Sequence, residues 1–346
     1  MSSQTKKIFS FLISLLLGIV LFIFVLRKVT LRDIFQTLSV FSLERGLIIF
    51  LFFLIGMIIP SWRWKLILQS QGYKVSLKKL FIAKLVGFSI NYITPSLYTG
   101  GEVARVYVLK KETGIPLTPG FVSILTDELV DFMLGILFFT IGSFFLLSQF
   151  RAPNYILWFL FLVILVGTIF WIYFYTRIKR GKNPFSSIIK FFKLDRINLI
   201  KNNEGNIVKM ERGIIDFFKY KKKTFFITFS LTILSLIVSL IQCWVILFFL
   251  NYNFSLGKII LIKLLLLLAG VIPIPGALGT LEATGALTFL ILRLEAHIGI
   301  SFVLVYRAFS LLLVALGIFF LFHLRVKSSK LFSTKNLDNN HNNQKS

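Results

Sequence analysis

Long apolar stretches constrain this chain more than any other feature of its sequence. Several contain the roughly 18–20 residues that a helix needs to cross about 30 Å of hydrocarbon. The clear spans are Ile8–Leu26, Gly46–Pro60 (extending to Leu68), Gly120–Leu147, Tyr155–Tyr175, Phe225–Leu250 and Ile300–His323. Because 56% of the 346 residues are hydrophobic, no soluble domain of this size could bury them. The sequence therefore predicts an all-α polytopic membrane protein with about six to eight transmembrane helices.

The first span begins like a signal peptide, because Lys6 and Lys7 precede it. No small-residue cleavage site follows, and Leu26-Arg27-Lys28 closes the run instead. We therefore expect a first helix that is retained.

Positive charge gathers between the spans. The formal net charge is +25, and residues 177–223 contain 14 Lys or Arg against four acids. The positive-inside rule places such segments, and with them both termini, on the cytoplasmic side of the cell membrane. Their expected partner is anionic lipid and not nucleic acid. We divide the chain into a transmembrane domain (1–325) with a basic amphipathic loop (177–224), and a disordered tail (326–346).

Two apolar segments do not fit simple crossings. Leu80–Leu97 lies between two basic loops and must enter and leave on the cytoplasmic side. Ile259–Ile298 begins and ends outside and is interrupted by Pro273, Pro275 and glycines. We expect two re-entrant hairpins that enter from opposite faces. Two full crossings of the second segment would satisfy the same charge count.

The two segments share a pattern. Pro95 precedes Glu102 by seven residues, Pro275 precedes Glu282 by the same interval, and glycine comes shortly before each glutamate. Broken segments at matching positions are typical of an inverted repeat with a binding site near the middle of the membrane. We predict such a repeat here.

Backbone N–H groups are the predicted donors of this site. Glycine lets a ligand approach the backbone, and helices that start after the glycines direct positive dipole ends toward an anion. Arg105 shares a helix face with Glu102 and could clamp a phosphate. The predicted substrate-binding residues are Gly100, Gly101, Glu102, Arg105, Gly276, Gly279, Glu282 and Arg307. The alternative is that Pro and Gly only permit close helix packing, while Glu102 and Arg105 neutralise each other.

Ionisable residues inside the spans are further candidates, because a charge in the membrane is costly and is often functional. Asp127 and Asp131 share one helix face, which suits gating or proton coupling. The alternative is that they lie near the cytoplasmic end and pair with Arg105 or the lysines that follow it. Arg307 stands far from either end of its span and needs a partner, for which we expect Glu282.

The sequence shows no motif typical of a cofactor, metal or ATP site. The three histidines are scattered, and neither a G-K-[ST] nor a G-x-S-x-G motif occurs. We therefore expect no cofactor and no enzymatic activity. Two alternatives are an intramembrane enzyme that uses Glu102 or the two aspartates as acid and base, and a membrane partner that recruits a separate synthase or glycosyltransferase.

Five motifs together resemble one known family, the lysylphosphatidylglycerol synthase transmembrane-region family. They are RWKLIL (63–68), NYITPSLYTGGEVARVYVLKKETGIPL (91–117), DELVD (127–131), IPIPGALGTLEA (272–283), and Arg307 with Gly317. The resemblance covers about residues 8–325. Glu128 stands where an arginine is expected after the acid, and Ala277 stands where glycine is usual.

This resemblance implies a flippase-like domain that moves lipids with modified headgroups between leaflets. Lysyl transfer is not expected, because the chain lacks the soluble transfer domains of some relatives. The sequence thus predicts a translocase for an anionic or phosphate-linked lipid, such as an aminoacylated phospholipid or a polyprenyl-phosphate glycan carrier. Arg105 and Arg307 would be the counter-charges, and Glu102, Glu282 and Asp131 would gate or take up protons.

Overall fold

The computed structural model describes residues 36, 39, 41–94, 100–149, 154–191, 204–270 and 272–342, and this part of the chain contains helices and no strands. The predicted first span, Ile8–Leu26, lies outside the described residues. Four described helices are long and apolar enough to cross a membrane: Leu43–Ser70, Leu160–Lys179, Lys222–Phe249 and Ala296–His323. The expectation of an all-α polytopic membrane protein is confirmed.

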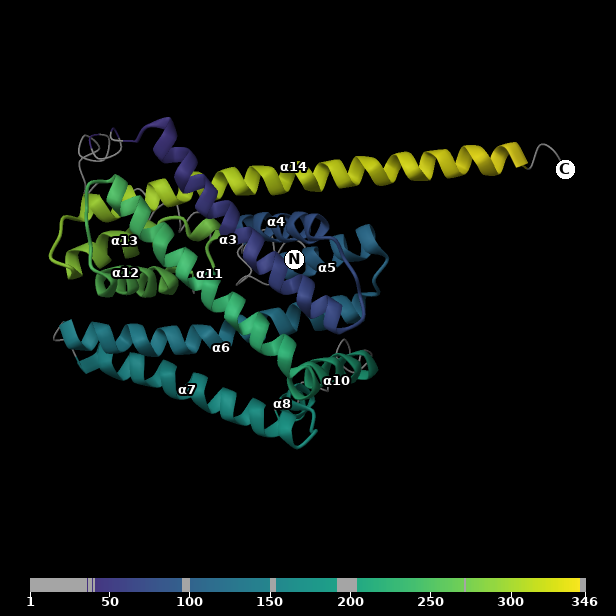
Figure 1. The fold of residues 1–346 in the computed structure, drawn as a ribbon, viewed down its shortest axis with the longest axis horizontal. Coiled ribbons are helices and arrows are strands. Elements are labelled where there is room, and N and C mark those ends of the chain that lie inside the picture. Colours follow the sequence, from purple (N-terminus) through teal and green to yellow (C-terminus); the bar gives the residue numbers. More distant parts are fainter. Residues whose placement is uncertain are drawn as a thin grey trace, which may run out of the picture.

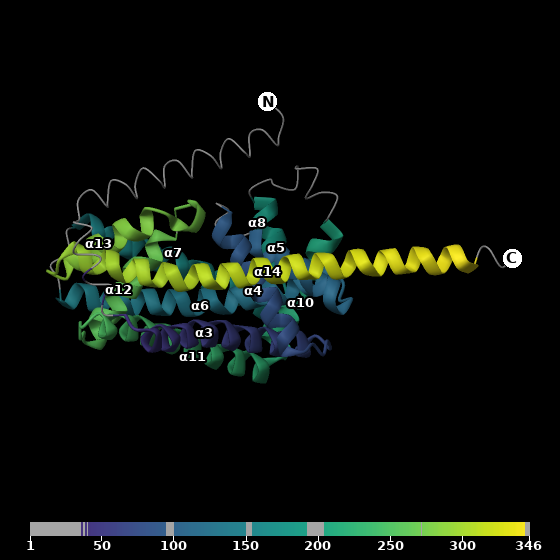
Figure 2. The same ribbon diagram turned by 90° about the horizontal axis from the view of Figure 1, so that it is seen from above.

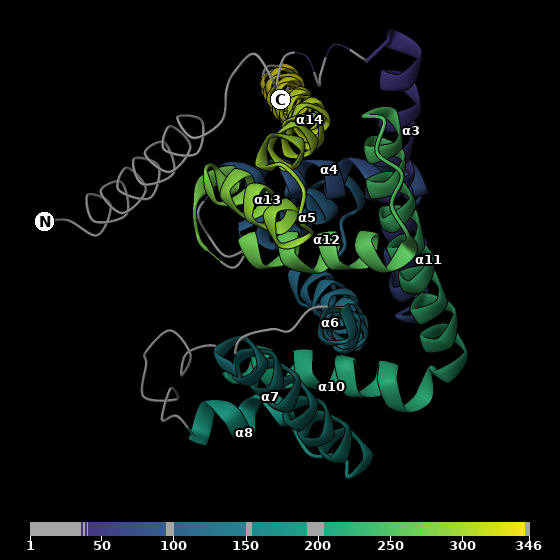
Figure 3. The same ribbon diagram turned by 90° about the vertical axis from the view of Figure 1, so that its left-hand side faces the viewer.

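Five long helices run lengthwise through the molecule, and α14 (Ala296–Asn342) extends well beyond the others (Figure 1). α3 (Leu43–Ser70), α7 (Asn154–Lys179) and α14 run in one direction. α6 (Leu117–Gln149) and α11 (Lys222–Phe249) run in the other. α3 and α11 lie side by side, and Figure 3 shows this pair along one flank of the bundle.

Two broken hairpins lie among the long helices. The first pairs α4 (Leu77–Ile93) with α5 (Gly100–Thr113), and the second pairs α12 (Leu256–Ala269) with α13 (Thr280–Ile291). The arms have 12 to 17 residues, fewer than the roughly 20 that a crossing needs. The second hairpin enters from the end where α3 begins, and the first enters from the end where α3 finishes (Figures 1 and 2). These features agree with the predicted inverted repeat and do not fit two full crossings of Ile259–Ile298.

Glycine pairs bring the hairpin arms close to their neighbours. A Cβ on Gly101 of α5 would collide with the Gly87 carbonyl oxygen of α4 and with the Asn91 side chain. A Cβ on Gly299 of α14 would likewise collide with the backbone of Gly285 in α13. Small residues have this role in membranes because close packing, and not apolar burial, drives helix association there.

Two short helices, α8 (Pro184–Phe191) and α10 (Glu204–Tyr220), form the basic end of the molecule. They connect the end of α7 to the start of α11 (Figure 1). Buried Ile214 and Ile215 of α10 pack with Phe174 and Ile178 of α7, while the charged face of α10 points outward. The basic loop is therefore partly folded onto the bundle.

At the end of the described chain, α14 continues to Asn342. The division into a transmembrane domain (1–325) and a disordered tail (326–346) stays a prediction.

Candidate functional site

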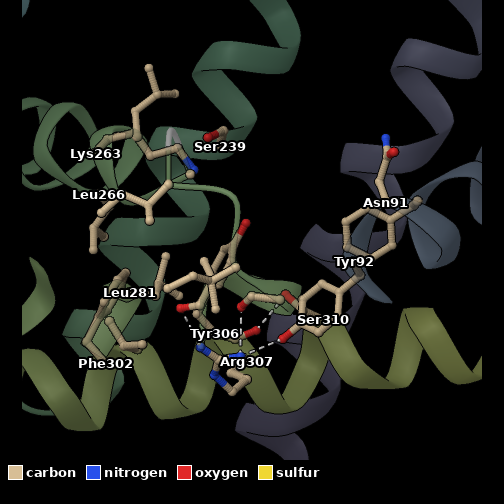
Figure 4. A pocket seen from close by; sticks show the side chains of 18 of the residues that line it. Asn91, Tyr92, Ser239, Lys263, Leu266, Leu281, Phe302, Tyr306, Arg307 and Ser310 are labelled. Atoms are coloured by element: carbon tan, nitrogen blue, oxygen red, sulfur yellow. Dashed lines mark hydrogen bonds between the residues drawn. The ribbon is translucent and has the colours of Figure 1, made fainter. Parts of the chain in front are cut away.

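A cavity of about 370 Å³ lies where the end of α4 meets the break of the second hairpin (Figure 4). Its walls come from the end of α4, from α11, α12, α13 and α14, and from residues of the irregular segment after α12. Most of the lining is apolar, and a few polar side chains converge on it, among them Asn91, Tyr92, Gln242, Lys263 and Arg307. This combination is typical of a ligand-binding cavity.

Arg307 of α14 links the two hairpins. Its Nε donates a hydrogen bond to Glu282 Oε1 at 2.7 Å, which confirms the ion pair expected from the sequence. Its Nη1 donates to the Tyr92 hydroxyl at 3.1 Å and to the Gly276 carbonyl at 2.9 Å, and Nη2 donates to the Ala277 carbonyl at 3.3 Å. Three of its four partners are neutral, so an anionic ligand could compete with them, because hydrogen bonds to ionised acceptors are stronger.

The second break is built from residues with positive φ. The φ angles are 58° at Gly276, 48° at Ala277 and 75° at Gly279, a region that glycine adopts freely. α13 begins directly afterwards, and Glu282 Oε2 accepts a hydrogen bond from the Gly279 N–H at 2.8 Å. This N–H is therefore occupied within the protein, and its predicted use for a ligand stays a prediction. The third residue of α13 reaches back to the N-terminus of its own helix and occupies the donor.

Lys263 of α12 is a second cation of the cavity, and the sequence analysis did not single it out. Its ammonium lies 5.6 Å from the centre of the Tyr306 ring and forms no ion pair within the described part of the chain. With Arg307 and its partner Glu282, the site holds two cations and one carboxylate. The buried Nε2 of Gln242, which also lines the cavity, has no hydrogen-bond partner among the described residues. The signal that could have found Lys263 was a lysine inside an otherwise apolar segment.

A separate set of charges, which we call the inner charge cluster, joins α3, α4, α5 and α6. Its members are Arg63, Lys84, Arg105, Asp127, Glu128 and Asp131. Arg63 Nε donates to Asp127 Oδ1 at 2.6 Å, and its Nη2 donates to Asp131 Oδ2 at 2.5 Å. Its Nη1 also contacts Asp131 and donates to Thr232 of α11 at 2.8 Å. The cluster holds equal numbers of cations and carboxylates, which offsets the cost of burying them.

The inner charge cluster pairs Asp127 with Arg105, as the alternative for the two aspartates predicted. Arg105 Nη2 donates to Asp127 Oδ2 at 2.9 Å, and neither Arg105, Asp127 nor Asp131 lines the cavity. The alternative in which Arg105 and Glu102 neutralise each other is wrong, because Glu102 Oε1 accepts from Asn91 Nδ2 at 3.2 Å. The carboxylates of α6 lie against α5, so Arg105 finds its partners outside its own helix.

Gly100 and Gly101 begin α5 and do not line the cavity. The Gly101 N–H donates to Asn91 Oδ1 at 2.6 Å, and the glycine packs against Gly87, as the close-packing alternative predicted. Of the predicted substrate-binding residues, the structure brings Gly276 and Arg307 to the cavity, with Glu282 behind Arg307. It leaves Gly100, Gly101, Glu102, Arg105 and Gly279 outside the lining. The described side chains contain no group that could hold a metal ion.

Comparison with known proteins identifies relatives along nearly the whole chain. The family model for the lysylphosphatidylglycerol synthase transmembrane region matches residues 11–317. A UPF0104 membrane protein of Methanocaldococcus jannaschii is 27% identical over 314 residues, which cover 87% of this chain and 91% of that protein. A UPF0104 membrane protein of Methanothermobacter thermautotrophicus is 33% identical over 69 residues, 20% of each chain. No solved structure matches the chain.

Proposed function

The chain belongs to the lysylphosphatidylglycerol synthase transmembrane-region family, and from this membership we propose that it moves lipids with an anionic, phosphate-linked headgroup between the leaflets of the cell membrane. Aminoacylated phospholipids and polyprenyl-phosphate glycan carriers are lipids of this class. The observation that carries the proposal is the cavity between the end of α4 and the break of the second hairpin, with its excess of positive charge. Broken helices that meet in this way form the substrate sites of many transporters.

In this proposal the headgroup phosphate lies between Arg307 and Lys263. A guanidinium can bind two phosphate oxygens at once, whereas an ammonium acts as a point charge. The phosphate would replace the neutral partners of Arg307, while Glu282 remains its ion-pair partner. The hydrocarbon chains would stay against the apolar walls and the surrounding lipid.

We further propose that the inner charge cluster is the gate on the side from which the first hairpin enters. It ties α5 to α6 through Arg105 and ties α3 to α6 and α11 through Arg63. Rearrangement of these pairs would release the first hairpin, and transport would be passive or coupled to an ion. By the positive-inside rule, this end, which also carries α8 and α10, faces the cytoplasm.

A catalytic role is not part of the proposal. An intramembrane enzyme would need a carboxylate that can take up and release a proton. Asp127 is bonded by Arg63, Lys84 and Arg105 together, so both of its carboxylate oxygens are occupied within the protein. This arrangement supports a structural or gating role for Asp127.

The test is leaflet exchange in proteoliposomes with a fluorescent, headgroup-anionic lipid and an external quencher. Lys263→Met removes one cation of the cavity. Lys258→Met is the matched control, since Lys258 lies on the same helix over the Phe254 ring and does not line the cavity. We expect exchange to slow about tenfold in Lys263→Met, from the loss of one charge-assisted contact of about 1.5 kcal/mol. Lys258→Met should behave like the wild type.

A zwitterionic probe supplies the second control. Because this probe carries no excess negative charge, we expect it to exchange more slowly than the anionic probe. Its exchange rate should also change less in Lys263→Met. Two results would contradict the proposal. One is that the wild-type protein exchanges no anionic probe, and the other is that the two lysine variants exchange the anionic probe at equal rates.

A further inference from the structure

A second cavity, of about 490 Å³, lies at the basic end of the molecule. It is formed by the last turn of α7, the turn that follows, and the C-terminal half of α10, and it shares no residue with the cavity between the hairpins. We call it the basic pocket. Its polar lining includes Arg177, Lys182, Asn183, Arg212, Asp216 and Lys219.

The charges of the basic pocket are unbalanced. Four cations and one carboxylate line it, which leaves an excess of three positive charges. Within the described part of the chain none of the four cations forms an ion pair. Arg177 lies over the Tyr173 ring at 5.4 Å and Lys219 over the Tyr220 ring at 5.2 Å. Like charges that converge without partners repel one another, and a bound anion would relieve the repulsion.

The spacing along α10 produces part of this convergence. Arg212, Asp216 and Lys219 follow one another at four and then three residues, so they share one helix face. The opposite face buries Ile214 and Phe217 in the bundle. The polar face of α10 therefore points toward the pocket as a consequence of its apolar packing.

The walls of the pocket are held in place by contacts behind them. The buried Glu211 of α10 accepts hydrogen bonds from the backbone N–H and the hydroxyl of Ser186 in α8. The Tyr173 hydroxyl donates to the Pro184 carbonyl at 3.1 Å. A Cβ on Gly213 would come within 2.8 Å of a Val122 methyl group, so α10 packs tightly on α6. A ligand would meet a preformed site and would not have to order it.

The position of the pocket indicates which anion it meets. The apolar span of α7 ends at Lys179, and Arg177 of the pocket lies in that last turn. This is the level at which a span leaves the hydrocarbon for the headgroup region. Tyr220, which also lines the pocket and is 65% exposed, is of the aromatic type that anchors proteins at this level.

We propose that the basic pocket binds the phosphate of an anionic phospholipid headgroup in the leaflet next to α8 and α10. The arginines bind the phosphate oxygens, and the lysines contribute point charges. Asp216 accepts hydrogen bonds from hydroxyl or ammonium groups of the headgroup. This site holds a lipid at the surface, so it is independent of the transport proposed for the other cavity.

The test uses the full chain in a neutral detergent, with thermal unfolding measured while a short-chain phosphatidylglycerol is added. Phosphatidylcholine and inorganic phosphate at equal ionic strength are the comparison ligands. Arg212→Gln with Lys219→Gln removes two pocket cations. Lys222→Gln with Lys223→Gln removes the same charge from the same end, at residues that do not line the pocket.

We expect phosphatidylglycerol to raise the Tm more than the two comparison ligands do. The apparent affinity should fall at least about tenfold in the pocket variant, which loses two charge-assisted contacts, and change little in the control. Lys182→Gln should also lower the affinity for phosphatidylglycerol. Because Lys182 lies in an exposed turn, this variant tests the pocket even if the double variant is unstable. Leaflet exchange by the pocket variant should match the wild type, so this proposal and the transport proposal can fail separately.

Two results would overturn the inference. Equal weakening in both double variants would show general attraction to a basic surface and no defined pocket. An equal, saturable shift with inorganic phosphate would assign the pocket to a soluble anion instead of a lipid.

Discussion

Ala277 occupies a backbone conformation that suits glycine. Its φ is 48°, and the left-handed region costs an L-amino acid about 1–2 kcal/mol. The same residue presents its carbonyl oxygen to Arg307 Nη2. Local strain is therefore located at the wall of the cavity, where the second hairpin must turn within a few residues.

The strain at Ala277 can be tested by a single substitution. Ala277→Gly should stabilise the protein by about 1 kcal/mol, because glycine adopts the observed φ without the steric cost. Ala283→Gly is the matched control within α13, where the same change should destabilise by about 1 kcal/mol. Thermal unfolding in detergent measures both. A lower Tm for Ala277→Gly would contradict the strained conformation.

At the scale of the elements, the first hairpin depends on the contact between α4 and α5. Gly101 faces the Gly87 carbonyl oxygen, and a backbone atom cannot rotate away from an added methyl group. Gly56 of α3 provides a contrast, since nothing lies within 4 Å of a Cβ built there. Identical substitutions at the two glycines therefore separate helix propensity from helix packing.

We predict opposite results for Gly101→Ala and Gly56→Ala. Gly101→Ala should destabilise by about 1–3 kcal/mol, the usual cost of overpacking, and should slow leaflet exchange because Asn91 moves with the hairpin. Gly56→Ala should stabilise by up to about 1 kcal/mol through helix propensity. Unfolding in detergent and the exchange assay provide the two readouts. An unchanged Tm in Gly101→Ala would mean that the two helices are not in close contact.

At the scale of the whole molecule, the basic end and the opposite end should face different compartments. α11 runs between them, from the basic residues near Lys223 to the turn at Asn253. Cysteine accessibility can test this in a Cys243→Ala background, since Cys243 is the single cysteine of the chain.

An impermeant maleimide should label Lys223→Cys in inside-out vesicles and Asn253→Cys in right-side-out vesicles, because the positive-inside rule orients the basic end. Both positions are exposed at the protein surface. Permeabilised vesicles, in which both cysteines should react, are the control. Labelling of both from one side would contradict the crossing of α11.

Much of the architecture could be predicted from the sequence because it depends on local composition. Apolar length determines which segments can cross the membrane, and Pro275 with its neighbouring glycines determines where the second hairpin breaks. Basic residues between the spans predict which end faces the cytoplasm, and this orientation stays a prediction. The ion pair of Arg307 with Glu282 was also predictable, since a buried arginine needs an acid and few acids were available to it.

The tertiary structure decided between the pairings that the sequence left open for Arg105, and it brought Lys263 into the site. Arg105 bonds to Asp127 and not to Glu102, three residues away on its own helix, because α6 packs against α5. Lys263 reaches the cavity because the end of α4 and the break of the second hairpin meet beside α12. In each case the neighbouring group belongs to another helix: Asp127 of α6 for Arg105, and Tyr306 of α14 for Lys263. The distance between the two groups depends on how closely the two helix backbones approach each other. Sequence spacing describes one helix at a time, so the site follows from packing between helices.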